Sequence, residues 1–404
     1  MTAIWTQAAL WMALALVATL LAVGFRVATA LSEIVVGTIA QLLIGAAFGT
    51  AILATDASWL QFLAGAGAIL LTFLAGAELD PSVFRRQWRQ ALAIGLVSFA
   101  VPFLGCAAAA RWLLGWDPLA SWLAGIAMST TSVAVIYAVM LEFGLNITDY
   151  GKAVLAACFV TDLATVIGLG LIFAPFTAKT LVFLGAGIVA FVILPWLTPR
   201  FFKRFGNRPS ELEAKYLMMC LFGLGALATW ADSEAVLPAY LIGIVLAGTV
   251  GKDHALVRRL RTLTFGLLTP FYFIRAGSLV SLPSLAAAPA AFMVLLVAKM
   301  LTKIVGVYPL TRALKSPRQE SMYTTMLMST GLTFGTISAL FGLSHKIITQ
   351  AQYSALVAAV IGSAVVPTLI ANAFFLPRHL LAAGPAQSAG SAATAQRPPR
   401  DEAT

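Results

Sequence analysis

Long apolar stretches, separated by short polar loops, make up most of the chain. Most of them are long enough to cross the hydrocarbon core of a bilayer as a helix, which takes about 20 residues. Two stretches, 235–250 and 262–280, are short or are interrupted by Pro238 and Pro270. The pattern predicts an all-α polytopic membrane protein with thirteen transmembrane helices. Their ranges are 8–25, 30–53, 58–78, 90–111, 118–141, 150–174, 178–198, 212–231, 235–250, 262–280, 286–310, 320–343 and 352–377.

The composition agrees with a membrane protein and excludes several soluble classes. Of the 404 residues, 60% are hydrophobic and 10% are charged, and the mean hydropathy is +0.92, whereas soluble domains carry about 25% charged residues. The net charge of +10 comes from basic residues scattered over short loops, so nucleic acid is not an expected partner. The cysteines, Cys106, Cys158 and Cys220, lie in apolar stretches and show neither metal-ligand spacing nor a disulfide framework.

The basic residues alternate between successive loops and thereby predict an orientation. With the N-terminus outside, 20 of the 26 Lys and Arg residues fall in cytoplasmic loops or the C-terminal tail, three in outside loops and three inside apolar stretches. The positive-inside rule therefore favours thirteen crossings with a cytoplasmic C-terminus. The start of the chain lacks the basic region and cleavage site of a signal peptide, so the first helix is expected to be retained in the cell (inner) membrane.

One carboxylate lies deep inside an apolar stretch. Asp162 stands near the centre of residues 150–174, which no proline interrupts. Placing a carboxylate there costs roughly 2.5–3.5 kcal/mol on insertion scales. Such a residue indicates a functional site with a partner elsewhere in the membrane domain.

Two other stretches contain similar polar interruptions. A Met-Ser-Thr sequence begins at Met128 in residues 118–141 and again at Met328 in residues 320–343. An odd number of helices allows two six-helix units of opposite orientation, and paired interruptions at matching places are typical of a transporter site at the membrane midplane. The alternative is that these Ser, Thr and Gly residues only pack helices together. Two interruptions together with Asp162 favour the site.

Five motifs give the chain a family resemblance over nearly all of residues 8–377. In order and spacing it resembles the membrane domain of sodium/proton exchangers, in the monovalent cation:proton antiporter-2 branch that includes Kef-type and NapA-like proteins. The motifs are Leu74–Asp80, Ser129–Ser132, Phe159–Asp162, Lys303–Gly306 and Gly331–Gly335.

The resemblance implies an NhaA-like fold of two inverted six-helix repeats with crossed discontinuous helices. It implies an exchange of Na⁺ or K⁺ for H⁺, with Asp162 as the shared site and Lys303 as its counter-charge. It also implies a homodimer in which a core moves against a dimerisation part like an elevator. The corresponding ranges are 90–174 and 286–377 for the core, 8–78 and 212–280 for the dimerisation part, and 178–198 for a linker helix.

Two departures from family patterns affect the expectations. Electrogenic members have two adjacent acids where this chain has Thr161 and Asp162, which implies electroneutral exchange, although a lysine such as Lys303 is commoner beside two acids. Some Kef-type relatives carry a cytoplasmic nucleotide-binding domain after the last helix, whereas residues 383–404 are small, polar and proline-containing and are expected to be a disordered tail. A separate cytoplasmic regulatory subunit remains a candidate partner.

The chemistry of a hard monovalent cation fits these residues without a cofactor. Asp162 supplies the charge and Thr161 a neighbouring oxygen, while broken helices offer free carbonyls. Burial favours the protonated carboxyl, and a bound cation or a nearby ammonium favours the ionised one. One group that serves two ligands couples them by mutual exclusion. The further oxygen ligands expected from the crossing helices are Ser129, Thr130, Thr131, Ser132 and Thr333.

Other charged residues leave alternatives open. Lys299 lies one turn before Lys303 on the same helix face and is the second candidate partner of Asp162. Arg275 is expected either to line an ion funnel or to form a structural pair with Glu33 or Glu78.

Other functional classes fit less well. A sodium-coupled solute symporter of the same plan usually has more than one cation-binding acid. A cation channel would need a re-entrant filter loop, which the sequence does not show. An intramembrane protease would need two aspartates or a Ser/His pair at membrane depth. The chain is therefore not expected to be an enzyme.

Overall fold

The computed structural model describes residues 2–25, 28–48, 53–77, 81–145, 148–173, 177–206, 210–231, 233, 235–287 and 289–380. Every regular element in these ranges is helical, which confirms the predicted all-α class. Nine helices of this part of the chain are long and apolar enough to cross a membrane. The count of thirteen crossings stays a prediction.

The helices follow the apolar stretches of the sequence closely. Three of them are clearly longer than predicted: α1 begins at Thr2, α4 already begins at Pro81, a residue suited to the first helical turn, and α8 continues to Phe205. The elements are α1 (Thr2–Phe25), α2 (Thr29–Phe48), α3 (Ser58–Ala77), α4 (Pro81–Trp112), α5 (Pro118–Ser129), α6 (Val133–Glu142), α7 (Asp149–Phe173), α8 (Ala178–Phe205), α9 (Leu212–Trp230), α10 (Val236–Leu246), α11 (His254–Leu263), η2 (Thr264–Leu268), α12 (Thr269–Ser278), α13 (Leu282–Ala287), α14 (Pro289–Ala313), α15 (Arg318–Met328), α16 (Thr333–Ser344), α17 (Gln350–Ile370), η3 (Ala371–Phe375) and η4 (Arg378–Leu380).

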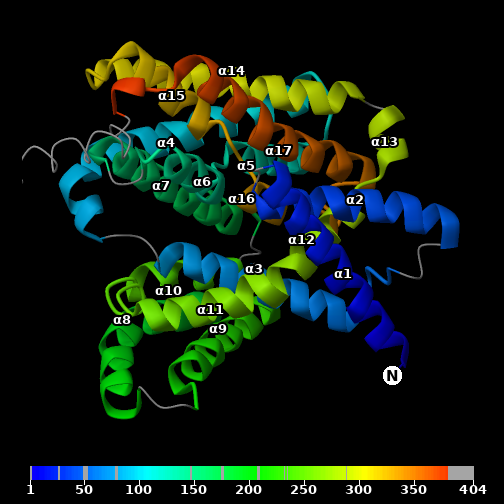
Figure 1. The fold of residues 1–404 in the computed structure, drawn as a ribbon, viewed down its shortest axis with the longest axis vertical. Coiled ribbons are helices and arrows are strands. Elements are labelled where there is room, and N and C mark those ends of the chain that lie inside the picture. The colour runs from blue at the N-terminus through cyan, green and yellow to red at the C-terminus, as the bar shows by residue number, and fades with distance from the viewer. Residues whose placement is uncertain are drawn as a thin grey trace, which may run out of the picture.

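The helices form two packed sets (Figure 1), and the chain passes between them three times, once through α13. In the first set, α1–α3 and α8–α12 with η2, helix α3 packs on α10 and α12, and α2 packs on α12. In the second set, α4–α7 and α14–α17 with η3 and η4, helix α4 contacts α5, α7 and α14. Glycines allow the closest crossings: a Cβ atom at Gly76 would lie 2.9 Å from the Ile244 backbone nitrogen, so α3 and α10 meet backbone to backbone.

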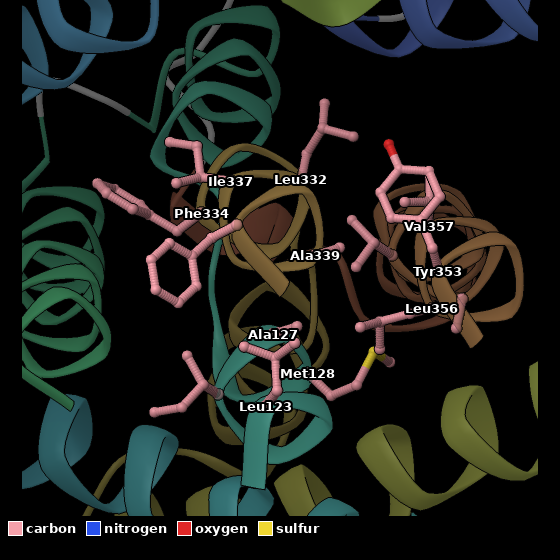
Figure 2. Packing of buried hydrophobic residues seen from close by; sticks show 14 of the residues in the cluster. Leu123, Ala127, Met128, Leu332, Phe334, Ile337, Ala339, Tyr353, Leu356 and Val357 are labelled. Carbon is pink, nitrogen blue, oxygen red and sulfur yellow. The ribbon is translucent and has the colours of Figure 1, made fainter. Parts of the chain in front are cut away.

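The largest hydrophobic core lies where the two sets meet. Figure 2 shows side chains of α5, α16 and α17 that form part of this core, among them Leu123, Phe334 and Leu356. The same cluster includes Tyr240 of α10 and Tyr272 of α12 from the first set. The interface between the two sets is therefore largely apolar in the part of the chain that the structure describes.

Both interruptions predicted from the Met-Ser-Thr sequences are helix breaks. Helix α5 ends at Ser129 and α6 begins at Val133, while α15 ends at Met328 and α16 begins at Thr333. The breaks face each other, because Thr131 Oγ1 donates a hydrogen bond of 3.4 Å to the Met328 carbonyl. Two discontinuous helices therefore meet in the centre of the second set.

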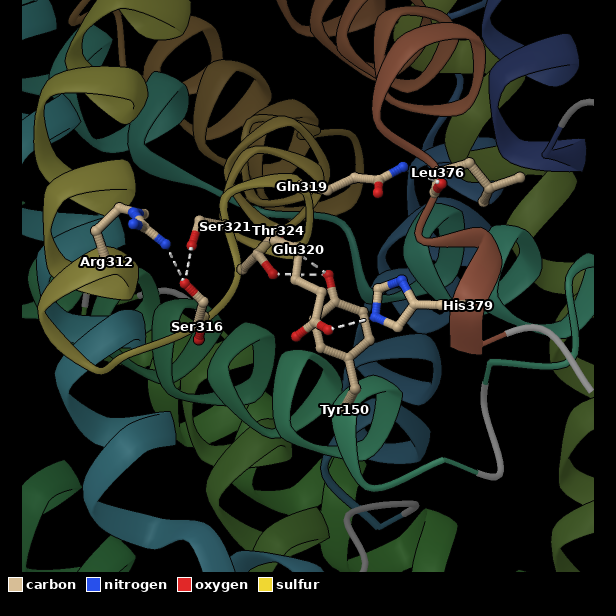
Figure 3. A network of polar contacts seen from close by, with 9 residues as sticks. All are labelled: Tyr150, Arg312, Ser316, Gln319, Glu320, Ser321, Thr324, Leu376 and His379. Atoms are coloured by element: carbon tan, nitrogen blue, oxygen red, sulfur yellow. Dashed lines mark hydrogen bonds and ion pairs between the residues drawn. The ribbon is translucent and has the colours of Figure 1, made fainter.

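A polar network ties the start of α15 to α7 and to the chain after α17 (Figure 3). Tyr150 Oη lies 2.8 Å from Thr324 Oγ1 and donates to the Glu320 carbonyl at 3.3 Å. The Glu320 carboxylate lies 2.8 Å from His379 Nε2. These contacts hold the end of α15 that lies away from its break against α7 and η4.

Candidate functional site

Asp162 lies on α7 and is 2% exposed. Its Oδ1 atom is fully buried and has no hydrogen-bond partner among the described residues. A buried carboxylate oxygen without a donor is destabilising, because burial removes its hydration and nothing replaces it. Buried polar atoms of this kind call for a specific explanation, and an exchangeable ligand is one.

Lys303 on α14 has a fully buried ammonium that reaches the break between α5 and α6. It donates to Ser98 Oγ at 2.7 Å, to the Ser129 carbonyl at 3.0 Å and to Thr131 Oγ1 at 3.4 Å. The Ser129 carbonyl belongs to the C-terminal end of α5, where a positive charge is favourable. Lys303 also lies within electrostatic range of Asp162, although no ion pair within 4.0 Å joins these two described residues.

Lys299, one turn earlier on α14, is linked through a hydrogen bond to the break between α15 and α16. Its ammonium is also fully buried and donates to Ser363 Oγ at 3.1 Å. The Ser363 hydroxyl in turn lies 3.2 Å from the Gly331 carbonyl, inside the break between α15 and α16. Gly331 has no room for a side chain, because a Cβ there would lie 2.7 Å from Thr130 Oγ1 and even closer to the Lys299 ammonium. The two lysines thus support one break each.

The Thr161 hydroxyl, predicted as an ion ligand, is engaged with backbone in this structure. It lies 3.1 Å from the Gly95 carbonyl of α4 and 3.1 Å from the Ala157 carbonyl of α7. Successive helix positions point about 100° apart, so Thr161 and Asp162 present different faces. Gly95 permits this contact, because a Cβ there would lie 2.7 Å from the Ala157 carbonyl oxygen.

The predicted crossing-helix residues do gather at the breaks. Ser129, Thr130, Thr131 and Ser132 are all buried, and Thr333 opens α16. The Ser129 and Thr130 hydroxyls donate to the carbonyls three residues earlier, at 2.8 and 3.0 Å. These hydroxyl oxygens keep lone pairs available while they cap the end of α5.

Of the residues expected to form a funnel or a structural ion pair, Arg275 and Glu33 are described and do not pair with each other. Arg275 donates to the Thr55 carbonyl at 2.8 Å and lines a cavity of about 570 Å³ between α3, α9, α12 and α16. No ion pair joins it to Glu33 among the described residues. Glu33 is itself buried, at 3% exposure in α2. Glu78 lies outside the described residues.

Three residues that the sequence did not single out contribute to the site. Ser98 and Ser363 accept from the two lysines, and Tyr240 donates from α10 to the Phe159 carbonyl at 3.1 Å. A lone serine or tyrosine in an apolar stretch is common, so no local pattern distinguishes these three. Their partners lie 64–205 positions away in the chain, at separations that helix periodicity does not reach.

Comparison with known proteins decides the family. The family model described as "Sodium/hydrogen exchanger, transmembrane" matches residues 12–376. The chain belongs to the sodium/hydrogen exchanger family. The match covers both helix breaks, Asp162 and both buried lysines, which confirms the resemblance found in the sequence.

Individual relatives carry antiporter or efflux names. Cation/H(+) antiporter 17 of Arabidopsis thaliana is 28% identical over 67% of this chain and 35% of that protein. The glutathione-regulated potassium-efflux system protein KefC of an Enterobacter species is 27% identical over 70% of this chain and 47% of that protein. The chain thus spans about a third to a half of the length of these two relatives.

A solved structure shares the fold. The sodium proton antiporter MjNhaP1 from Methanocaldococcus jannaschii matches with a TM-score of 0.67 and 15% identity, over 92% of this chain and 96% of that one. At 15% identity the match shows a shared fold and no more. The sodium/hydrogen exchanger family is a family of membrane transporters, and the helical architecture described above agrees with it.

Proposed function

We propose that the protein exchanges a monovalent cation, Na⁺ or K⁺, for H⁺ across the membrane, with Asp162 as the shared binding site. The observation that carries the proposal is the buried Asp162 oxygen without a hydrogen-bond partner, beside two broken helices and a buried ammonium. Relatives with cation/H⁺ antiporter and potassium-efflux names agree with this cargo.

Competition at one carboxylate couples the two ions. A proton neutralises Asp162 covalently, whereas a cation neutralises it electrostatically and needs further oxygens around it. Hydroxyls and carbonyls at the breaks, including those of Thr130 and Thr131, would supply those oxygens. The empty, charged site is the least stable state in a low-dielectric interior, so only loaded forms are expected to cross.

The architecture supports alternating access of the elevator type. The second helix set holds the breaks, Asp162 and both lysines, and it meets the first set across a largely apolar interface. We propose that the second set is the moving core, that α8 of the first set is the linker, and that the rest of the first set is the dimerisation part. The proposal keeps thirteen crossings in two inverted repeats, an outside N-terminus, a cytoplasmic C-terminus, residues 383–404 as a tail and a homodimer. A cytoplasmic regulatory subunit, as a further partner, is part of the same proposal.

Cation-dependent proton movement is the direct test of the function. In everted vesicles or proteoliposomes with an imposed pH gradient, adding Na⁺ or K⁺ is expected to dissipate the gradient, because the cation displaces the proton from Asp162. A fluorescent pH reporter measures the change, with choline as the control cation. A gradient that is indifferent to both Na⁺ and K⁺ would contradict the proposal.

Electroneutrality is a separate expectation from the Thr161–Asp162 pair. One carboxylate carries one cation in one direction and one proton in the other, so no net charge should move. Exchange in sealed proteoliposomes is therefore expected to leave a potential-sensitive dye unchanged. A potential that builds up during exchange would show that unequal numbers of protons and cations are exchanged, and would contradict electroneutrality.

A further inference from the structure

Few hydrogen bonds cross between the two helix sets among the described residues. Most of them gather where α12 runs into α13 and meets the start of α17. There, Tyr353 Oη donates to the Ala276 carbonyl at 2.8 Å, and the Ser281 amide donates to Ser354 Oγ at 2.8 Å. This cluster lies beside α13, which carries one of the three chain connections between the sets. Because these hydrogen bonds add to the chain connection there, relative displacement of the sets is expected to be small at this place, which we call the pivot.

One bond stands apart from that cluster. Tyr240 Oη of α10 donates to the Phe159 carbonyl of α7 at 3.1 Å. Phe159 precedes Asp162 by less than one helical turn. Tyr240 is fully buried, and its ring meets Phe334 of α16 edge to face, with centroids 5.6 Å apart. One side chain of the first set thus contacts both the helix that carries Asp162 and the helix that follows the second break.

The anchor of Tyr240 in the first set is tight. A Cβ atom at Gly243, one turn after Tyr240, would lie 3.0 Å from the Ala77 backbone nitrogen and 3.0 Å from the Gly76 Cα atom. Such contact between backbones leaves α10 little freedom to slide along α3. Movement of the second set would therefore displace α7 relative to α10, and at this contact Tyr240 provides the hydrogen bond.

We propose that Tyr240 is a positioning residue for transport: its bond to Phe159 holds α7 on α10 in this conformation and breaks whenever the second set moves. A displacement of more than about 1 Å already stretches a 3.1 Å bond beyond hydrogen-bonding distance. The bond stabilises the conformation described here and does not stabilise the transition state for movement of the second set. This inference rests on the proposed exchange function.

The first test is kinetic. Tyr240→Phe keeps the ring and its packing on Phe334 and removes only the hydroxyl. Maximal exchange is expected to rise about two- to tenfold, the range set by one net hydrogen bond, at an unchanged half-saturating cation concentration. Tyr353→Phe, which removes an equivalent buried phenol–carbonyl bond at the pivot, is the matched control and is expected to change the rate less than twofold, about the precision of such assays. An unchanged or lower maximal rate in Tyr240→Phe would refute the proposal if the parent protein exchanges ions.

The second test does not depend on transport. Hydrogen–deuterium exchange in lipid nanodiscs is expected to be faster for peptides of α7 around Phe159 in Tyr240→Phe than in the parent protein, and unchanged there in Tyr353→Phe. If the α7 peptides take up deuterium at the parental rate in Tyr240→Phe, Tyr240 does not hold α7 in place and the inference fails. A parent protein that moves no ions refutes the proposed function instead. The hydrogen–deuterium exchange measurement then tests by itself whether Tyr240 holds α7.

Discussion

Asp162→Asn is expected to abolish cation-driven proton movement while the protein still folds. Asparagine has nearly the same shape, but it neither binds a proton nor balances a cation. A cation in the buried site would then lack its counter-charge, which costs several kcal/mol and lowers exchange by about a hundredfold or more. The rate of gradient dissipation in proteoliposomes measures the loss.

The same substitution is expected to leave stability unchanged or to increase it. The buried Asp162 oxygen without a donor is a feature that destabilises the fold. Replacing the carboxylate by a neutral amide removes the cost of burying a charge, so thermal unfolding in detergent should occur at the same temperature or a few degrees higher. Gain of stability with loss of activity is the signature of a strained functional group.

Asp149→Asn is the matched control, since Asp149 is an exposed carboxylate at the start of the same helix. Its exchange rate is expected to stay within about twofold of the parent. Retained exchange in Asp162→Asn would contradict the assignment of the site. A loss of exchange together with a large fall in unfolding temperature would indicate a structural role for Asp162 instead.

The sequence predicted the helical fold well, for a physical reason. Apolar stretches of membrane length have few alternatives to a helix, because the hydrocarbon core leaves no other partner for the backbone. The two breaks were also predictable, because Gly331 and the neighbouring hydroxyl residues interrupt otherwise apolar stretches. The early start of α4 at Pro81 was missed, because the polar residues that follow it resemble a loop.

The candidate site was predictable in its residues and less so in their contacts. Asp162 and both lysines stand out because buried charge is rare in membranes. Their partners do not stand out: Lys303 binds the Ser129 carbonyl and Ser98, neither of which carries a charge. Thr161 was singled out for its place next to Asp162, although adjacent helix residues point in different directions.

The two lysines differ in a way that a pair of substitutions can measure. Lys303→Met is expected to leave the Ser129 carbonyl and the Ser98 hydroxyl buried without their donor, at about 1–3 kcal/mol for each unsatisfied group. It also removes the charge that acts on Asp162. Unfolding should therefore occur several degrees lower, and exchange should be lost even at temperatures where the variant is folded.

Lys299→Met is the comparison, because it fills the same kind of space one turn away and breaks a single hydrogen bond among the described residues, to Ser363. Its loss of stability is expected to be smaller, about 1–2 kcal/mol, and exchange should persist at a reduced rate because Asp162 keeps Lys303 nearby. Unfolding temperature and exchange rate, measured on both variants, separate the roles. Exchange that survives Lys303→Met and disappears in Lys299→Met would make Lys299 the counter-charge, and would require Asp162 to approach the second break during the cycle.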